Sequence, residues 1–388
     1  MFSLKKNPFI TLLIIILSLT PVTAQEIIGI GETRILRSRI LEEDRQIQVY
    51  LPPSYRNSNL EKTTYPVLYL LDSESHFHYL SGYVEKLSQG PYAAIPELIV
   101  VGIVNTHRSR DLTPSVTLDR ATQKPDSLNS GGNDRFFSFI KEELFAWVER
   151  EYRTDDYKIL IGHSYGGITA LNALLNHTKM FQAYVVHDPS IWYDQELLLQ
   201  RFEQASHADL LHSKLFLTQA GDTFKSGKLE VHFNAIKKFR ALLELGTLKN
   251  LTWNYQQYAQ EDHGSIPLIG NLDGLRYIFK GHQIDIKSVA DQPELIAATY
   301  AKLSEELHFP FHPTEVYVDR VAHYLLRSNH FEQAFRYFME NAERHPRSAN
   351  AQYSLYQYHL KIDGKTDAAI HLKKAEKLGY TLTQTPQP

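Results

Sequence analysis

A serine between glycines is the clearest chemical signature in the sequence. The string GHSYGG at residues 162–167 follows the apolar residues 159–161 and precedes a helix-like segment. A sharp turn from strand to helix leaves room only for glycine on either side of its serine, and it exposes the serine hydroxyl. G-x-S-x-G is not specific by itself, but this strand–turn–helix context favours a nucleophile. We therefore predict that Ser164 attacks a substrate carbonyl.

A serine nucleophile needs an imidazole that takes its proton and an acid that orients the imidazole, in the chain order serine, acid, histidine. Of the 18 histidines, His263 stands out because it follows the last strand-like run and directly precedes a helix-like segment. For the acid we favour Asp222, which comes after the strand-like run 215–217. Glu230 is its rival, and Asp222 could instead cap a helix.

The oxyanion of a tetrahedral intermediate needs two backbone N–H donors. Tyr165, the residue after the nucleophile, supplies one by position, and we expect Ser73 or its neighbour, after the apolar run 67–71, to supply the other. His163 lies inside the turn with its side chain directed away from the hydroxyl. We expect it to pack or to line the pocket.

Alternating strand and helix patterns must position these residues. Residues 33–51 have the alternation of an antiparallel hairpin, with the acidic residues 42–44 at its turn. Further strand candidates are 67–71, 98–103, 158–161, 184–186, 215–217 and 251–258, and helix candidates are 136–152, 168–176, 231–245 and 266–279. This order predicts an α/β fold, a mostly parallel central sheet with helices on both faces.

The pattern after about Lys280 is helical throughout and predicts a second, all-helical domain over residues 289–388. Ala334 and Ala368 are 34 residues apart, which is the period of the tetratricopeptide repeat (TPR). A generic helical hairpin packed on the first domain is the alternative reading.

The beginning of the chain and its composition narrow the classes of function. Residues 1–24 combine two lysines, an apolar stretch and small residues, so we predict a cleaved signal peptide and an exported, periplasmic or secreted protein. Cysteine is absent, which excludes disulfides and thiol chemistry. The net charge of −3 gives no field for nucleic acid or an anionic membrane. We expect a small-molecule ester as substrate, a protein partner at the C-terminal helices, and neither cofactor nor metal.

Five motifs in order extend this reading to a known family. They are Tyr69–Asp72, Arg108–Pro114, the glycine–serine turn, Asp188–Asp194 and Glu261–Ser265. With them, residues from about Arg45 to Lys280 resemble the putative esterases that include esterase D and, more closely, the enterochelin-esterase-like serine hydrolases. The resemblance implies an α/β-hydrolase fold over residues 25–288 and cleavage of esters, often of oligoester siderophores. Asp188 and Ser73 depart from the family pattern, which usually has serine and glycine there.

Three residues are candidates for substrate binding. Arg108 and Arg110 could bind a carboxylate or catecholate with two parallel hydrogen bonds, or they could brace a loop. Trp192 could form an aromatic wall, or it could be part of the core. We expect a serine hydrolase that forms an acyl-enzyme. The alternatives are an acyltransferase with the same triad and an interaction module with a vestigial hydrolase domain.

Overall fold

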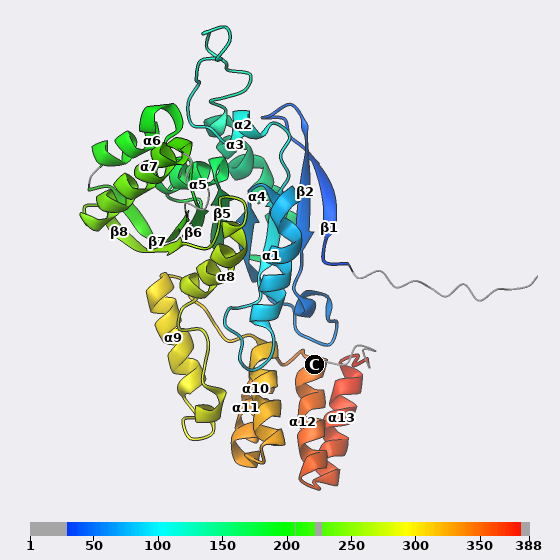
Figure 1. Cartoon of the computed structure of the whole chain (residues 1–388). Helices are drawn as coiled ribbons and strands as arrows, with labels where there is room; N and C mark the ends of the chain where they lie inside the picture. Colours follow the sequence, from blue (N-terminus) through cyan, green and yellow to red (C-terminus); the bar gives the residue numbers. More distant parts are fainter. Residues whose placement is uncertain (1–28, 206, 222–226, 382–388) are drawn as a thin grey trace, which may run out of the picture.

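An eight-stranded sheet forms the centre of the molecule (Figure 1). The computed structural model describes residues 29–205, 207–221 and 227–381. The strands lie in the order β1-β2-β4-β3-β5-β6-β7-β8, with β2 antiparallel to both neighbours and the other pairs parallel. Their bounds are β1 Glu32–Arg37, β2 Asp44–Tyr50, β3 Tyr65–Leu70, β4 Ile99–Ile103, β5 Thr154–His163, β6 Ala183–His187, β7 Asp209–Ala220 and β8 Lys249–Tyr258. The predicted opening hairpin and the six later strands are confirmed.

Helices cover both faces of the sheet. They are α1 Ser73–Ser88, α2 Arg108–Asp111, α3 Asn133–Phe139, α4 Phe145–Glu151, α5 Tyr165–Asn176, α6 Tyr193–Gln204, α7 Gly227–Glu244 and α8 Ile266–Ile278, with a π-helical turn, η2 Ile140–Leu144, joining α3 to α4. This arrangement confirms the α/β class. The sequence patterns anticipated α5, α7, α8 and the α3–α4 segment, whereas α1, α2 and α6 were not predicted.

The alternation of side chains along each strand divides the interior into two cores. In β3, Val67 and Tyr69 pack with the residues of α3 to α7 on one face. Leu68 and Leu70 point to the other face, where α1 and α8 pack. Successive side chains of a strand point to opposite faces, so an uninterrupted apolar run is what a strand covered on both sides requires.

The C-terminal region is helical, and all but the last of its described helices contribute side chains to the second of these cores. These helices are α9 Leu295–Leu307, α10 Glu315–Arg327, α11 Phe331–Arg344, α12 Ala349–Lys361 and α13 Lys365–Lys377, preceded by the short helix η3 Ile286–Val289. Tyr157 of β5 lies against Phe309 and Phe311, with ring centroids 5.5 and 5.1 Å apart. The helical region lies against one end of the sheet domain (Figure 1), and the two share an apolar interior.

Polar contacts add a second attachment at the loop after β2. The side-chain amide of Asn59 donates to Thr381 O at 2.7 Å and accepts from Thr381 N at 2.9 Å. Asn59 O accepts from Asn350 N at 2.8 Å, and Glu61 forms an ion pair with Arg347 at 2.8 Å. These contacts hold the ends of α12 and α13 against the sheet domain.

Deleting residues 289–388 should lower the melting temperature on the order of 10 °C, because it exposes the apolar surface that the sheet domain shares with α9 and α10. The kcat/KM for a small p-nitrophenyl ester should stay within about tenfold of the full-length value, since none of the predicted catalytic residues follows Lys280. Thermal melts and kinetics of the 25–288 fragment check both statements. A folded fragment without activity would show that the tail completes the active site.

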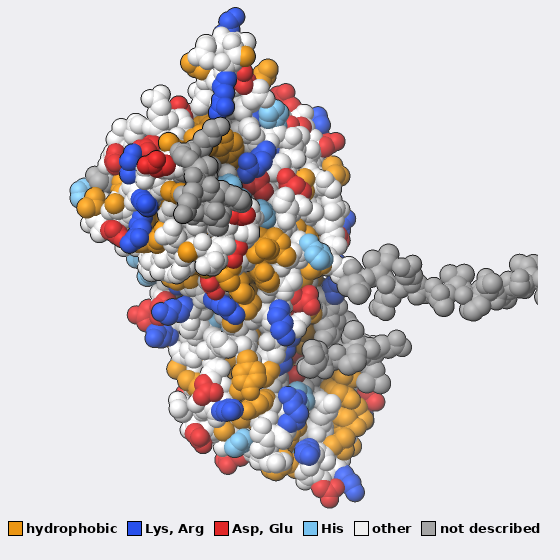
Figure 2. Space-filling view, viewed as in Figure 1, with side chains coloured by type: hydrophobic (Ala, Val, Ile, Leu, Met, Phe, Trp, Pro, Cys, Tyr) orange, Lys and Arg blue, Asp and Glu red, His pale blue; other side chains and the backbone are white. Residues whose placement is uncertain are grey.

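The described residues contain no helix long and apolar enough to cross a membrane. The predicted signal peptide, residues 1–24, lies outside the described residues. On the face shown in Figure 2, acidic and basic side chains are interspersed over the sheet domain and the helical tail.

Candidate active site

The predicted turn from strand to helix is present, and Ser164 is at its apex. Ser164 follows β5 and precedes α5, with φ 60° and ψ −113°, a backbone conformation that is costly for a residue with a side chain. A Cβ atom at Gly162 would lie 2.1 Å from the carbonyl oxygen of Gly166. Only glycine fits at that position, which explains the spacing read from the sequence.

The nucleophile turn is bonded to the neighbouring strand end. Ser164 N donates to His187 O at 3.0 Å, and Ser190 N donates to Ser164 O at 3.1 Å. The hydroxyls of Ser164 and Ser190 share a hydrogen bond of 3.2 Å. The segment that follows β6 therefore lies directly beside the proposed nucleophile.

His263 lies between β8 and α8, as predicted, and its ring packs against the turn. Its centroid is 4.5 Å from that of His163, the residue before Ser164. Nδ1 of His263 is 2.6 Å from Oδ2 of Asp188. An ionised carboxylate only accepts hydrogen bonds, so His263 must carry its proton on Nδ1, which leaves Nε2 with a lone pair. This is the tautomer that a general base needs.

Among the described residues, the acid that contacts His263 is Asp188, which was not among the predicted acids. Asp188 follows β6, is fully buried and has a φ of 41°. Asp222 lies outside the described residues, and its rival Glu230 is exposed on α7. The sequence analysis noted Asp188 only as a departure from the family motif and assigned it no role in the triad.

The surroundings of Asp188 keep it ionised. Burial by itself would raise the pKa of its carboxyl, but hydrogen bonds from His232 and His263 hold that pKa well below its usual range. Ala220 N also donates to Oδ1 at 3.0 Å. The buried carboxylate thus has donors on both oxygens, which buried charges need.

His163 has the packing role expected of it. Burial and the neighbouring histidines His263 and His187 lower the pKa of His163 to about 2. A neutral ring in this position forms a wall beside His263 without adding a competing positive charge.

Helices α1 and α5 both begin close to the turn that carries Ser164. Tyr165 and Ser73 are the first residues of α5 and α1, and Leu71 N donates to Ile161 O at 3.0 Å, which ties the two strand ends together. A Cβ atom at Gly166 would lie 3.1 Å from Oδ2 of Asp72. Backbone N–H groups at helix beginnings are suited to bind a negative charge, which is consistent with the predicted donor roles of Tyr165 and Ser73.

Comparison with known proteins agrees with this geometry. The family model described as "Putative esterase" matches residues 38–276. The chain belongs to this esterase family. The resemblance read from the sequence motifs is confirmed, and the protein is an esterase.

Individual relatives support the assignment. A crystal structure of an IroE-like serine hydrolase from Shewanella oneidensis is 32% identical, has a TM-score of 0.71, and is similar over 81% of this chain and 99% of that one. The ferri-bacillibactin esterase BesA of Bacillus subtilis (strain 168) is 26% identical over 249 residues, which are 61% of this chain and 84% of BesA. A siderophore enterobactin esterase of Emericella nidulans is 29% identical over 206 residues, 45% of this chain and 66% of that protein. The first of these also confirms the fold class.

The arginines proposed to bind substrate are engaged with acidic side chains of the esterase. Arg108 donates to both oxygens of Asp72, from Nε at 2.6 Å and from Nη2 at 3.0 Å. The side chain of Arg108 is 37% exposed. Its guanidinium carbon lies 5.5 Å from the centroid of the Tyr165 ring. Arg108 therefore fastens the beginning of α1 beside the nucleophile turn, and its side chain remains partly exposed.

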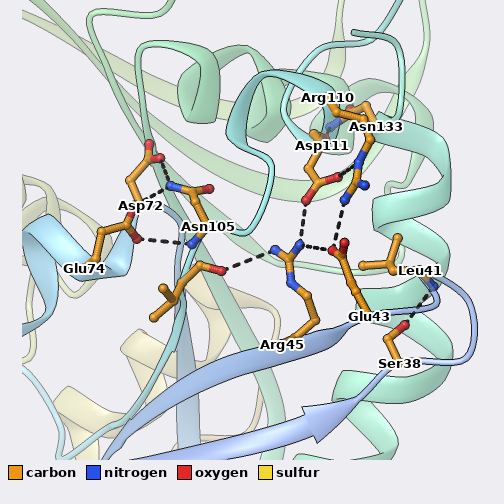
Figure 3. Close-up of polar contacts among 11 residues, drawn as sticks. Ser38, Leu41, Glu43, Arg45, Asp72, Glu74, Asn105, Arg110, Asp111 and Asn133 are labelled. Carbon is orange, nitrogen blue, oxygen red and sulfur yellow. Dashed lines mark hydrogen bonds and ion pairs between the residues drawn. The ribbon is translucent and has the colours of Figure 1, made fainter. Parts of the chain in front are cut away.

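Arg110 belongs to a cluster of ion pairs with Glu43, Arg45 and Asp111 (Figure 3). Its guanidinium donates to Asp111 at 2.7 Å and to Glu43 at 2.9 Å. Arg45, which is fully buried, bonds to the same two carboxylates at 2.6 and 2.7 Å. Arg110 therefore braces a loop, which is the alternative to substrate binding that was considered from the sequence.

Asn105 extends the polar contacts toward the beginning of α1 (Figure 3). Its side-chain amide donates to Asp72 at 2.6 Å and to Glu74 at 2.7 Å. Asp72 has a φ of 52°, so these contacts and those of Arg108 stabilise a strained backbone at the candidate oxyanion loop.

Trp192 contributes an aromatic surface close to the turn. It is partly exposed, and its ring centroid lies 6.3 Å from that of Tyr165. Tyr193 is buried instead and donates its hydroxyl to Ser115 O at 2.9 Å. Of the two aromatic residues, Trp192 is the one available to a substrate.

One set of side chains has the donor atoms for a small divalent cation. Asp188, His232 and His263 each offer a ligand atom, and these atoms lie within 4.8 Å of one another. The hydrogen bonds from the two histidines to Asp188 account for the same arrangement.

Proposed function

We propose that this esterase hydrolyses carboxylic esters through an acyl-enzyme on Ser164, with His263 as general base and Asp188 as the orienting acid. The observation that carries the proposal is the 2.6 Å contact between His263 Nδ1 and Asp188 Oδ2, in a chain whose glycine-flanked serine is at a strained strand-to-helix turn. The family supports the ester as substrate class.

The chemistry proceeds in two halves. His263 Nε2 takes the proton of the Ser164 hydroxyl as Oγ attacks the ester carbonyl, and the backbone N–H of Tyr165, together with that of Ser73, stabilises the oxyanion. Collapse of the tetrahedral intermediate breaks the bond to the alcohol, which leaves with the proton from His263. Water then attacks the acyl group by the same route and releases the acid and free Ser164.

We further propose that the natural substrate is an oligoester siderophore. The relatives named as ferri-bacillibactin and enterobactin esterases support this class. The partly exposed Arg108 and Trp192 beside the turn are consistent with an anionic, aromatic ligand. The proposal includes export with removal of residues 1–24, an esterase domain over 25–288 and a TPR-like helical domain over 289–388 that binds a protein partner.

A comparison of substrates tests the proposal. The purified enzyme is incubated with a ferric triscatecholate trilactone, a p-nitrophenyl ester and a matched thioester, with Ser164→Ala as control, and products are separated by liquid chromatography. We expect linear oligomers from the trilactone at a kcat/KM above that for the simple ester. Hydrolysis of the simple ester alone would remove the siderophore assignment. Transfer of the acyl group to an added alcohol in preference to water would indicate an acyltransferase.

A further inference from the structure

The carboxylate of Asp188 has a second histidine partner. Nε2 of His232 is 2.9 Å from Oδ2 of Asp188, the same oxygen that faces His263. The rings of His232 and His263 are 5.4 Å apart and nearly perpendicular. Since an ionised carboxylate only accepts, both histidines present an N–H to one oxygen, His263 from Nδ1 and His232 from Nε2.

The helix that carries His232 holds it firmly. Ala235, Ile236 and Phe239 are buried, and with His232 they have the spacing of one face of a helix. Phe239 packs against Phe202 of α6 at 4.9 Å. His232 is therefore a polar residue at a core-facing position of α7, where an unpaired ring nitrogen would be costly. Asp188 is its partner there.

The two histidines differ in how they are supported. The side chain of His263 is 44% exposed on a loop, whereas that of His232 is 8% exposed on an 18-residue helix. Asp188 is thus fixed from two rigid elements, by Ala220 N at the end of β7 and by His232 on α7. His263 is the more exposed of the two histidines and contacts the same carboxylate from a loop.

We infer that His232 is a positioning residue of the catalytic triad, which holds Asp188 in the orientation that receives the Nδ1 proton of His263. The inference rests on the proposed function. His232 takes no part in proton transfer to the substrate, which is the role of His263.

Three substitutions of His232 distinguish a role as hydrogen-bond donor to Asp188 from a role in packing alone. His232→Gln retains an N–H donor at a similar reach, His232→Met keeps the volume but has no donor, and His232→Asn is too short to reach Asp188. We expect the Met and Asn variants to lose on the order of 10- to 100-fold in kcat with little change in KM, the effect of removing a hydrogen bond to a charged group. The Gln variant should recover most of that loss.

His177→Met is the control. His177 is a partly buried histidine that packs on Phe137, and it lies at the C-terminal end of α5, whereas Ser164 lies at the N-terminal end. The substitution should leave kcat unchanged.

A spectroscopic measurement accompanies the kinetics. The proton between His263 Nδ1 and Asp188 should give a low-field proton NMR signal in the wild type and in His232→Gln, and the signal should weaken or disappear in His232→Met and His232→Asn. Donor-less variants with a kcat within twofold of wild type, or a Gln variant as impaired as the Met variant at equal thermal stability, would overturn the inference. A wild type without esterase turnover that still shows the signal would instead contradict the proposed function.

Discussion

Asp188→Asn should lower kcat by a factor on the order of 10⁴ while leaving the fold intact. An amide at this position presents an N–H group toward His263, which favours the imidazole tautomer with its lone pair on Nδ1 and its proton on Nε2. The base then has no lone pair for the Ser164 proton, and the same substitution in a serine protease triad has an effect of this size. Steady-state kinetics on a p-nitrophenyl ester, with a thermal melt of each variant, measure the change.

Two matched variants decide between the acids. Asp222→Asn and Glu230→Gln each remove the charge of one carboxylate that the sequence suggested, and both should keep kcat within about tenfold of wild type. If kcat falls strongly in Asp222→Asn and stays near the wild-type value in Asp188→Asn, Asp222 is the acid of the triad. In the sequence, Asp188 follows β6 and Asp222 follows β7, and these strands are neighbours in the sheet. The comparison therefore also tells which strand is followed by the acid of the triad.

Ser164→Ala should remove ester turnover, with a loss on the order of 10⁵-fold or more, because the attacking atom is gone. Alanine fits the same turn, so the melting temperature should change little. His263→Ala should cost a similar amount, and the double variant should be no worse than either single one, since both residues act in one unit.

Ser190→Ala is the matched control for the nucleophile. It removes the hydroxyl that pairs with Ser164 at 3.2 Å but leaves the nucleophile and base in place, so the loss should be about tenfold. A Ser164→Ala enzyme that retains activity within a few fold of wild type would exclude this serine as the nucleophile.

Local patterns in the sequence were sufficient for the parts of the site that depend on local geometry. Ser164 is defined by a turn that only glycine neighbours permit, and His263 by its place between the last strand and the next helix. Strands β3, β4 and β6 could be read as apolar runs because both of their faces are buried. Strands β1 and β2 were read instead from their alternation. Helix α1 was missed because several of the residues that it buries are small and polar, namely Ser73, Ser81 and Ser88.

The acid depended on information that local sequence does not contain. Asp188 and Asp222 both come after a strand, and only the three-dimensional course of the chain shows which carboxylate reaches the histidine. Asp188 has a left-handed backbone that turns its side chain toward α7 and His263, an orientation that residue types and spacing do not predict. The same holds for His232, whose helical position marks it as core-facing but does not name its partner.

Covalent labelling of the nucleophile tests the central claim most directly. The purified enzyme is treated with a p-nitrophenyl phosphonate, which stays attached to a serine nucleophile after losing p-nitrophenol. Intact-mass and peptide mass spectrometry then locate the adduct. The account predicts one adduct per chain, on the peptide that contains Ser164, loss of esterase activity in proportion to labelling, and no adduct in Ser164→Ala. An adduct on another residue that accompanies the loss of activity, or inactivation of the wild type without modification of Ser164, would contradict it.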